Sequence, residues 1–225
     1  MNMLITSGAT REPLDGVRFI TNFSTGATGA ALTDAFRKTG HRAFYLHGQG
    51  AVLPGTNGPM EEFFDFAGLD AALRRLLKAG GFDAVIHLAA VSDYSVAEIR
   101  AGKKRAKPGT AAKLDSGLDL TVRLRRNFKI LDRLTRYAGS KKIFIAGFKL
   151  TCAKSESARR QAGRKLSLRP GVSLAVHNDM LDIRRNKRLF TLYSNGTAAG
   201  RCSGTTALAR RLISLSKEKQ NAACA

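Results

Sequence analysis

The sequence predicts an α/β fold, a three-layer sandwich in which helices cover both faces of a mostly parallel sheet. Short apolar runs alternate with segments of helical periodicity along the whole chain, which is typical of parallel strands joined by helices. The chain has 225 residues, of which 44% are hydrophobic, so it can bury one substantial core. Neither an internal repeat nor a convincing linker divides it, and we therefore expect a single domain over residues 1–225.

The first half of the chain carries the clearest alternation. The run MLITS stops at Gly8 and is typical of a buried parallel strand, and glycines follow both expected helices. Between Gly8 and about Phe23 we expect a long polar loop. The predicted elements are a strand at 3–7, a helix at 27–39, strands at 42–47 and about 61–66, a helix at 68–79 and a strand at 84–90.

The second half opens with the most polar stretch of the chain. The run RAGKKRAKPGT is too charged and too rich in Gly and Pro for a core, so we expect a flexible basic loop at about 97–112. The elements predicted after it are a half-exposed strand at 118–124, a short helix at 129–137, a buried strand at 142–148, a basic helix at 155–168, a strand at 173–176, a hairpin from 188–193 to Arg201, and a helix at 205–217.

Charge and cysteine usage limit the class of protein. Lys and Arg number 38 against 17 Asp and Glu, a net charge of +21 that attracts nucleic acid, acidic membranes or phosphorylated small molecules. Cys152, Cys202 and Cys224 form neither a disulfide framework nor a metal pattern. The sequence shows no signal peptide and no apolar run long enough to cross a membrane, so we expect a cytoplasmic protein without a membrane partner.

Polar or glycine-rich residues follow four of the predicted strands, where open α/β sheets bind ligands. The segments are 7–8, 89–93, 147–149 and 177–179. A further segment, Asn22-Phe23-Ser24-Thr25-Gly26, precedes the first helix. Ser24 or Thr25 can cap that helix, whose free amides suit an anion. The preceding loop of about fifteen residues is longer than a routine connection, which favours a functional role for it.

Several other site types lack their patterns. The glycines before the first helix do not form G-x-G-x-x-G, and the strand at 42–47 ends without an acidic residue. Tyr137 and Lys141 match Y-x-x-x-K, a pattern common by chance, without the serine that reductase chemistry needs upstream. The four histidines show no ligand spacing, and we expect His87 to be a hydrogen-bonded core residue. A nicotinamide-dependent reductase is therefore the least favoured function that we consider.

A family resemblance spans almost the whole chain. Residues 5–15 (ITSGATREPLD) with 17–26 (VRFITNFSTG) resemble the opening signature of monofunctional phosphopantothenate–cysteine ligases, also called phosphopantothenoylcysteine synthetases. AAVSDY at 89–94 is similar to their second signature, and KLDS at 113–116 to their lysine element. GFKL at 147–150 and Asn178-Asp179 resemble the remaining two, in family order. The implied fold is a single Rossmann-like domain.

The resemblance implies a two-step ligation. The carboxylate of 4′-phosphopantothenate attacks the α-phosphate of CTP or ATP, and the amino group of L-cysteine then displaces the nucleotide from the acyl-nucleotidylate. This chemistry needs no protein nucleophile, because positioning and charge stabilisation supply the catalysis. Mg²⁺ is expected to share the neutralisation of the phosphates. Because nothing precedes the ligase signature, no flavin is expected.

The resemblance also implies roles for individual residues. Asn22 and Lys113 are the expected catalytic residues, with Asn22 on the activated carboxylate and Lys113 on the triphosphate. The residues expected to bind the nucleotide are Gly8, Ser24, Gly26, Ala89, Asp93, Phe128, Phe148, Lys165 and Arg169. Those expected to bind the substrate are Asn22, Ala90, Asp93 and Asn178. No protein side chain is assigned to a metal.

Departures from the family pattern leave alternatives open. Ala27 stands where a basic residue is usual, and Asn127-Phe128-Lys129 lacks the usual proline. Lys103 and Lys104 compete with Lys113 for the triphosphate. CTP is favoured, and ATP stays possible. Family members pair, so we expect a homodimer. The second hypothesis, a nucleic-acid-binding protein, accounts for the charge of +21 but lacks a recognised nucleic-acid motif.

Overall fold

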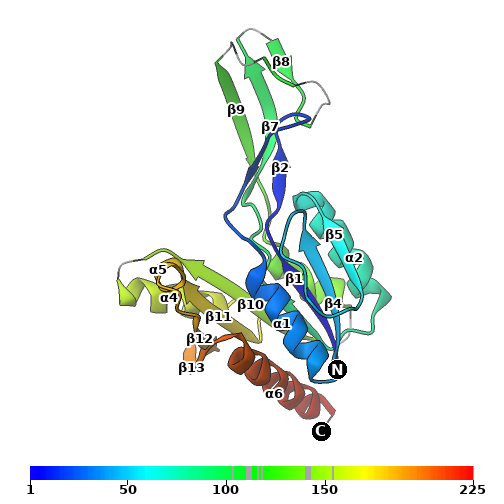
Figure 1. Ribbon diagram of the computed structural model, residues 1–225, viewed down its shortest axis with the longest axis vertical. Coiled ribbons are helices and arrows are strands. Elements are labelled where there is room, and N and C mark those ends of the chain that lie inside the picture. Colours follow the sequence, from blue (N-terminus) through cyan, green and yellow to red (C-terminus); the bar gives the residue numbers. More distant parts are fainter. Residues whose placement is uncertain are drawn as a thin grey trace.

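The chain folds around an eight-stranded sheet, and a narrower arm of strands projects from one end of it (Figure 1). The computed structural model describes residues 1–102, 104–109, 113–115, 117, 119–139, 143–153 and 155–224. The strand order is β13-β12-β11-β10-β6-β1-β4-β5, and the first strand therefore lies in the interior of the sheet.

The sheet is mostly parallel, as predicted. Neighbours among β5, β4, β1, β6, β10 and β11 all pair in parallel, whereas β12 and β13 form an antiparallel edge. The strands are β1 (Asn2–Ser7), β4 (Arg42–Gly48), β5 (Met60–Phe63), β6 (Ala84–His87), β10 (Phe144–Thr151), β11 (Leu174–Asp179), β12 (Leu189–Ser194) and β13 (Thr197–Ser203). The buried residues of the inner strands β1, β4, β6, β10 and β11 are mostly apolar, because both faces of the sheet are covered there.

Helices cover both faces of this sheet and complete the three layers. On one face α1 and α6 contribute Phe36 and Leu212 to one apolar cluster, and on the other α2 and α3 contribute Leu73 and Leu134 to a second. The helices are α1 (Ala27–Lys38), α2 (Phe66–Ala79), the 3₁₀ turn η1 (Ile130–Arg133), α3 (Leu134–Tyr137), α4 (Glu156–Ser167), α5 (Met180–Arg184) and α6 (Thr205–Cys224). The α/β three-layer prediction is confirmed.

Close packing at one glycine brings α1 onto β1. A β-carbon at Gly29 would lie 2.2 Å from Oγ of Ser7, closer than atoms can approach. The hydroxyl of Ser7 also donates to the carbonyl of Gly26 at 3.0 Å. The start of α1 is therefore held directly against the end of the first strand.

The arm consists of two small antiparallel sheets. One pairs β2 (Arg11–Pro13) with β3 (Phe19–Thr21), and the other has the order β8-β7-β9. Strands β7 (Tyr94–Ala101), β8 (Lys104–Ala106) and β9 (Leu120–Arg126) leave the body together (Figure 1). The half-exposed strand predicted at 118–124 corresponds to β9, in the arm rather than in the main sheet.

Two loop predictions are wrong in part. The segment 8–23 contains the β2–β3 hairpin, and the expected flexible basic loop at 97–112 contains the end of β7 and all of β8. The reason is local pairing: β7 is hydrogen-bonded on both sides, and its Ile99 and Ala101 are buried despite the surrounding charge. Residues 103 and 110–112 lie outside the described part of the chain.

Candidate active site

The strand order contains one topological switch point. From β1 the chain builds β4 and β5 on one side and then returns to place β6 on the other side of β1. Connections leaving two adjacent strands in opposite directions open a crevice beyond their carboxyl ends, where α/β proteins bind ligands. The residues that follow β1 and β6 therefore define the candidate site.

The end of β1 meets an open helix terminus. Gly26 is the N-cap of α1 with φ 75°, a left-handed conformation that favours glycine. The expected cap by Ser24 or Thr25 is wrong. No described side chain makes a normal capping bond there, and Oγ1 of Thr25 accepts only a long one, at 3.4 Å, from the N–H of Ala27. With no acidic residue in the first turn, the amides of α1 stay available to an anion.

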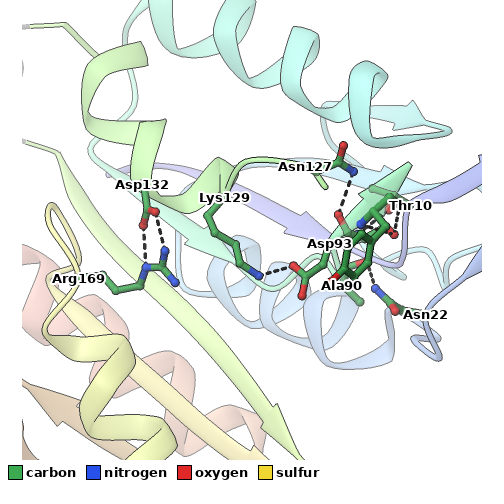
Figure 2. A network of polar contacts seen from close by, with 10 residues as sticks. Thr10, Asn22, Ala90, Asp93, Asn127, Lys129, Asp132 and Arg169 are labelled. Atoms are coloured by element: carbon green, nitrogen blue, oxygen red, sulfur yellow. Dashed lines mark hydrogen bonds and ion pairs between the residues drawn. The ribbon is translucent and has the colours of Figure 1, made fainter. Parts of the chain in front are cut away.

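Asn22 reaches from the hairpin to the turn that follows β6. Its Nδ2 donates to the carbonyl of Ala90 at 3.2 Å, as Figure 2 shows. The N–H of Ala90 donates to the carbonyl of Gly8 at 2.8 Å, and Thr10 donates its own N–H to Ala90 at 3.3 Å. Four residues expected in the site (Gly8, Asn22, Ala89 and Ala90) therefore meet at the switch point, where the Asn22 side chain is exposed.

The turn from Ala89 to Asp93 is held from several sides. The N–H of Ala89 donates to Oγ1 of Thr6 at 3.2 Å, and that of Ser92 donates to Oγ1 of Thr10 at 2.9 Å. The carboxylate of Asp93 is ion-paired with Lys129, a residue without a role in the sequence analysis (Figure 2). The turn thus presents a carboxylate and an ammonium, both partly exposed, beside Asn22.

His87 stabilises this turn through a hydrogen bond to Thr6. Burial lowers the pKa of His87 to about 4, so its imidazole is neutral at pH 7. Its Nδ1 lies 2.8 Å from Oγ1 of Thr6, the hydroxyl that also accepts from Ala89. The expectation of a hydrogen-bonded core histidine is confirmed.

Phe148 and Asn178 lie on the neighbouring strands of the same edge. β10 continues past the end of β6, so Phe148 projects beyond the last residue of that strand. Asn178 follows in register opposite Leu150 and lines a cavity of 480 Å³ between β11, β12 and α4. Next to it, hydrogen bonds from Thr151, Leu181 and Ala153 outweigh burial and lower the pKa of Asp179.

Four other expected residues do not join this group. Lys165 lies in the last turn of α4, which ends at Ser167, and Arg169 follows the helix. That end of α4 lies by the Asn195–Gly196 turn, at the amino ends of the parallel strands, and Arg169 pairs with Asp132 at 2.5 Å. Phe128 packs between the guanidinium of Arg133 and the ring of Phe66. Lys113 is the fourth expected residue that does not join the group.

Lys113 lies on the arm, where an anchored segment holds it. The carboxylate of Asp15 accepts hydrogen bonds from the N–H of Leu114 at 3.0 Å and from the guanidinium of Arg18 at 2.6 Å. Arg18 also donates to the carbonyl of Leu114 at 2.9 Å. The backbone of Lys113 is therefore fixed to the tip of the β2–β3 hairpin rather than to the main sheet.

The donor set favours anions over metal ions. Among the described residues, no group of three His, Cys, Asp or Glu side chains could hold a metal ion. The helix amides, the Asn22 amide and Lys129 are donors that suit carboxylates and phosphates. Within the same part of the chain, no helix is long and apolar enough to span a bilayer.

Comparisons with known proteins identify the family of the chain. The family model for the DNA/pantothenate metabolism flavoprotein C-terminal domain matches residues 1–216. The bifunctional coenzyme A biosynthesis protein CoaBC of Thermococcus kodakarensis is 31% identical over 178 residues, 79% of this chain and 41% of that protein. Phosphopantothenate–cysteine ligase 1 of Oryza sativa is 41% identical over 70 residues, 30% of this chain and 22% of that one. The chain thus spans less than half the length of these relatives.

Solved structures show the same fold. The DNA/pantothenate metabolism flavoprotein from Streptococcus pneumoniae superimposes with a TM-score of 0.81 at 21% identity, over 95% of this chain and 97% of that chain. A Cab2 variant in complex with phosphopantothenate-cysteine gives a TM-score of 0.80 at 19% identity, over 99% and 88%.

Proposed function

The chain belongs to the DNA/pantothenate metabolism flavoprotein C-terminal domain family, and on that premise we propose that it is a ligase joining 4′-phosphopantothenate to L-cysteine. The observation that carries the proposal is the meeting of Asn22 with the Ala89–Asp93 turn at the switch point. These are the segments of the first two family signatures. The names of the rice and Thermococcus relatives add support.

The proposed reaction proceeds in two balanced steps. A carboxylate oxygen of phosphopantothenate bonds to the α-phosphorus of the nucleotide, and pyrophosphate leaves. The amino nitrogen of cysteine then bonds to the acyl carbon, loses a proton, and expels the nucleoside monophosphate with that oxygen. Neither step is a redox reaction, so the proposal needs no flavin.

The site residues would act by position and charge. The Nδ2 group of Asn22 is exposed and carries a second hydrogen besides the one given to Ala90, so it can donate to the acyl phosphate. The open amides of α1 at Gly26 would hold a phosphate group. Lys129 would lend positive charge to the same edge, with Asp93 holding its ammonium in place. Lys165 and Arg169 are left out, because the end of α4 lies beside the β12–β13 turn and the guanidinium of Arg169 is paired with Asp132.

The nucleotide and metal are finer parts of the proposal. We favour CTP over ATP, and we place Mg²⁺ on the phosphates of the nucleotide, since the described side chains offer no metal site. No step is assigned to the ion. The proposal also includes a cytoplasmic location.

Exposed apolar side chains on the arm support a homodimer. Six apolar residues of the arm and its base are at least 37% exposed, and two copies of the arm could cover them together. They are Val17 (63% exposed), Phe19 (37%), Ile20 (39%), Phe23 (96%), Tyr94 (50%) and Leu124 (45%). In such a dimer, Lys113 on the arm of one copy would be able to reach the site of the other copy.

An isotope experiment tests the two steps. Phosphopantothenate labelled with ¹⁸O in its carboxylate is incubated with CTP, Mg²⁺, cysteine and the protein. The proposal predicts one ¹⁸O atom in the released CMP. Unlabelled CMP formed together with ligated product would contradict an acyl-nucleotidylate.

A further inference from the structure

We propose that Glu12, Ser95 and Asn127 form a hydrogen-bonded chain that positions the Ala89–Asp93 turn and its Lys129 partner. Glu12 lies within the opening signature and Asn127 in the element that lacks the usual proline, but no function was assigned to any of the three, and all act through other residues. The structural part of the proposal stands on contacts in this chain alone. Its effect on turnover rests on the proposed function.

Glu12 is the buried start of the chain of contacts. The residue is 3% exposed, and its carboxylate joins two elements of the body and arm. Oε1 accepts from the N–H of Phe66, the first residue of α2, at 3.0 Å. Oε2 accepts from the hydroxyl of Ser95 in β7 at 2.6 Å. A buried carboxylate needs such donors, so Glu12 fixes where the Ser95 hydrogen points.

The hydrogen of Ser95 in turn orients the amide of Asn127. A serine hydroxyl has one hydrogen, and the carboxylate of Glu12 can only accept. The oxygen of Ser95 is therefore left to accept from Nδ2 of Asn127 at 2.8 Å. The second Nδ2 hydrogen reaches the carbonyl of Ser92 at 3.2 Å. In the opposite arrangement Ser95 would donate to Oδ1 of Asn127 at 3.1 Å, and the carboxylate of Glu12 would lose the hydrogen bond that it accepts from Ser95.

Asn127 connects this chain of contacts to the Ala89–Asp93 turn. Its backbone N–H donates to the carbonyl of Asp93 at 2.8 Å, and two residues later Lys129 pairs with the Asp93 carboxylate. The turn is thus bound by Thr10 from the hairpin and by Asn127 from the end of β9. A cavity of 480 Å³ is lined by Glu12, Ser95 and Asn127 on one side and by Ala67 and Asp70 of α2 on the other. It leaves room for the Asn127 amide to move if Glu12 no longer holds Ser95.

Amide hydrogen exchange of the substrate-free full chain tests the positioning directly. Glu12→Gln and Ser95→Ala are compared with Glu61→Gln, which removes a carboxylate from an exposed ion pair with Arg75. Both test variants should speed exchange of the Ser92 and Asn127 amides by about tenfold, the effect of weakening about one hydrogen bond. Glu61→Gln should leave both amides unchanged. Unchanged exchange in both test variants would overturn the proposal, and Ser95→Ala decides alone if Glu12→Gln fails to fold.

Kinetics separate positioning from general destabilisation. In pyrophosphate release, Glu12→Gln should lower kcat by at least about tenfold with the nucleotide KM changed less than about threefold, because the turn is misplaced rather than lost. Adding Ser95→Ala to Glu12→Gln should cost little more, since both break the same chain of contacts. Fully additive losses would contradict the chain. If the wild-type protein released no pyrophosphate while the exchange results held, the proposed function would fail and the positioning would stand.

Discussion

Asn22 is the residue on which the chemistry of the site depends most. Its amide donates to the backbone of the turn after β6 and keeps one hydrogen for a ligand in the open crevice. Asn and Asp differ little in shape, so one substitution can change the charge at this point without changing the fold.

Asn22→Asp should reduce overall ligation at least about a hundredfold. A carboxylate at residue 22 would face the carbonyl of Ala90 and, once bound substrates displace water from the crevice, repel both the substrate carboxylate and the acyl phosphate, a cost of several kcal/mol. The measurement is steady-state ligation alongside thermal unfolding.

Asn195→Asp is the matched control. Asn195 has φ 47° in the β12–β13 turn, a conformation that Asp also tolerates, and lies at the opposite edge of the sheet. It should keep both activity and stability. Near-normal turnover of Asn22→Asp would reduce Asn22 to a structural role.

His87 makes the stability of the fold depend on pH. Because its pKa is about 4 in the folded protein and about 6.5 when unfolded, the unfolded chain binds more protons between these values. The free energy of unfolding should therefore fall as the pH drops through this window, by about 2 kcal/mol from this residue between pH 7 and pH 5. Burial also lowers the pKa of His41 and His177, which act in the same direction.

Urea unfolding at pH 7 and pH 5 measures this dependence. His87→Asn removes the titrating group, so the difference between the two pH values should shrink by about 2 kcal/mol, whatever the variant's absolute stability. An unchanged difference would show that His87 does not carry the pH dependence.

At the scale of elements, burial decided what the sequence could predict. The strands β1, β6, β10 and β11 are apolar runs covered on both faces, and each was predicted within a few residues. Of the arm strands, β9 was predicted from its alternation, whereas β2, β3, β7 and β8 escaped prediction because the arm strands pair with one another rather than with the main sheet. β3 has three residues, all exposed, and β8 has three residues of which two are charged, so both are too short to show a periodic pattern.

The residues of the candidate site also fall into those that the sequence could predict and those that it could not. The residues that end parallel strands, such as Gly8 and Ala90, could be placed because topology brings strand ends together. Lys129 and Glu12 are ordinary polar residues in sequence, and only the return of β9 to the body brings Lys129 to Asp93. The role of Lys165 stays a prediction, because its position in the sequence does not indicate which end of the sheet the end of α4 reaches.

Lys113 should matter more to activity than Lys103 and Lys104 together. Its backbone is anchored through Leu114 to Asp15 and Arg18, whereas Lys104 is exposed on β8 and Lys103 lies outside the described residues. Lys113→Ala should raise the nucleotide KM, lower kcat, or both. The Lys103→Ala, Lys104→Ala double variant should mainly weaken long-range attraction.

Ionic strength separates these two effects. High salt screens long-range attraction but affects a direct contact less, so the loss in the double variant should vanish there while that of Lys113→Ala persists. A larger loss in the double variant at high salt would move the triphosphate contact ten residues earlier.

At the scale of the whole molecule, the net charge of +21 and the arm have separate consequences. The charge attracts anionic substrates from a distance, which salt reduces. The arm extends away from the body (Figure 1) and leaves apolar side chains exposed, which favours association with a second copy.

Sedimentation equilibrium at micromolar concentration should therefore show a dimer. Val17→Ser, at the tip of the β2–β3 hairpin, should raise the dimer dissociation constant at least about tenfold, since each copy loses a buried apolar side chain. Leu168→Ser removes an apolar side chain of similar exposure (66% against 63%) outside the arm and should have no effect. A fully active wild-type monomer would contradict the dimer.

Pyrophosphate release tests the proposed ligase activity most directly. The full chain is incubated with Mg²⁺ and L-cysteine, with and without 4′-phosphopantothenate, and with CTP or ATP. We predict that release requires both the nucleotide and phosphopantothenate, and that it is faster with CTP. Equal release without phosphopantothenate, or no release with all substrates present, would contradict the assignment.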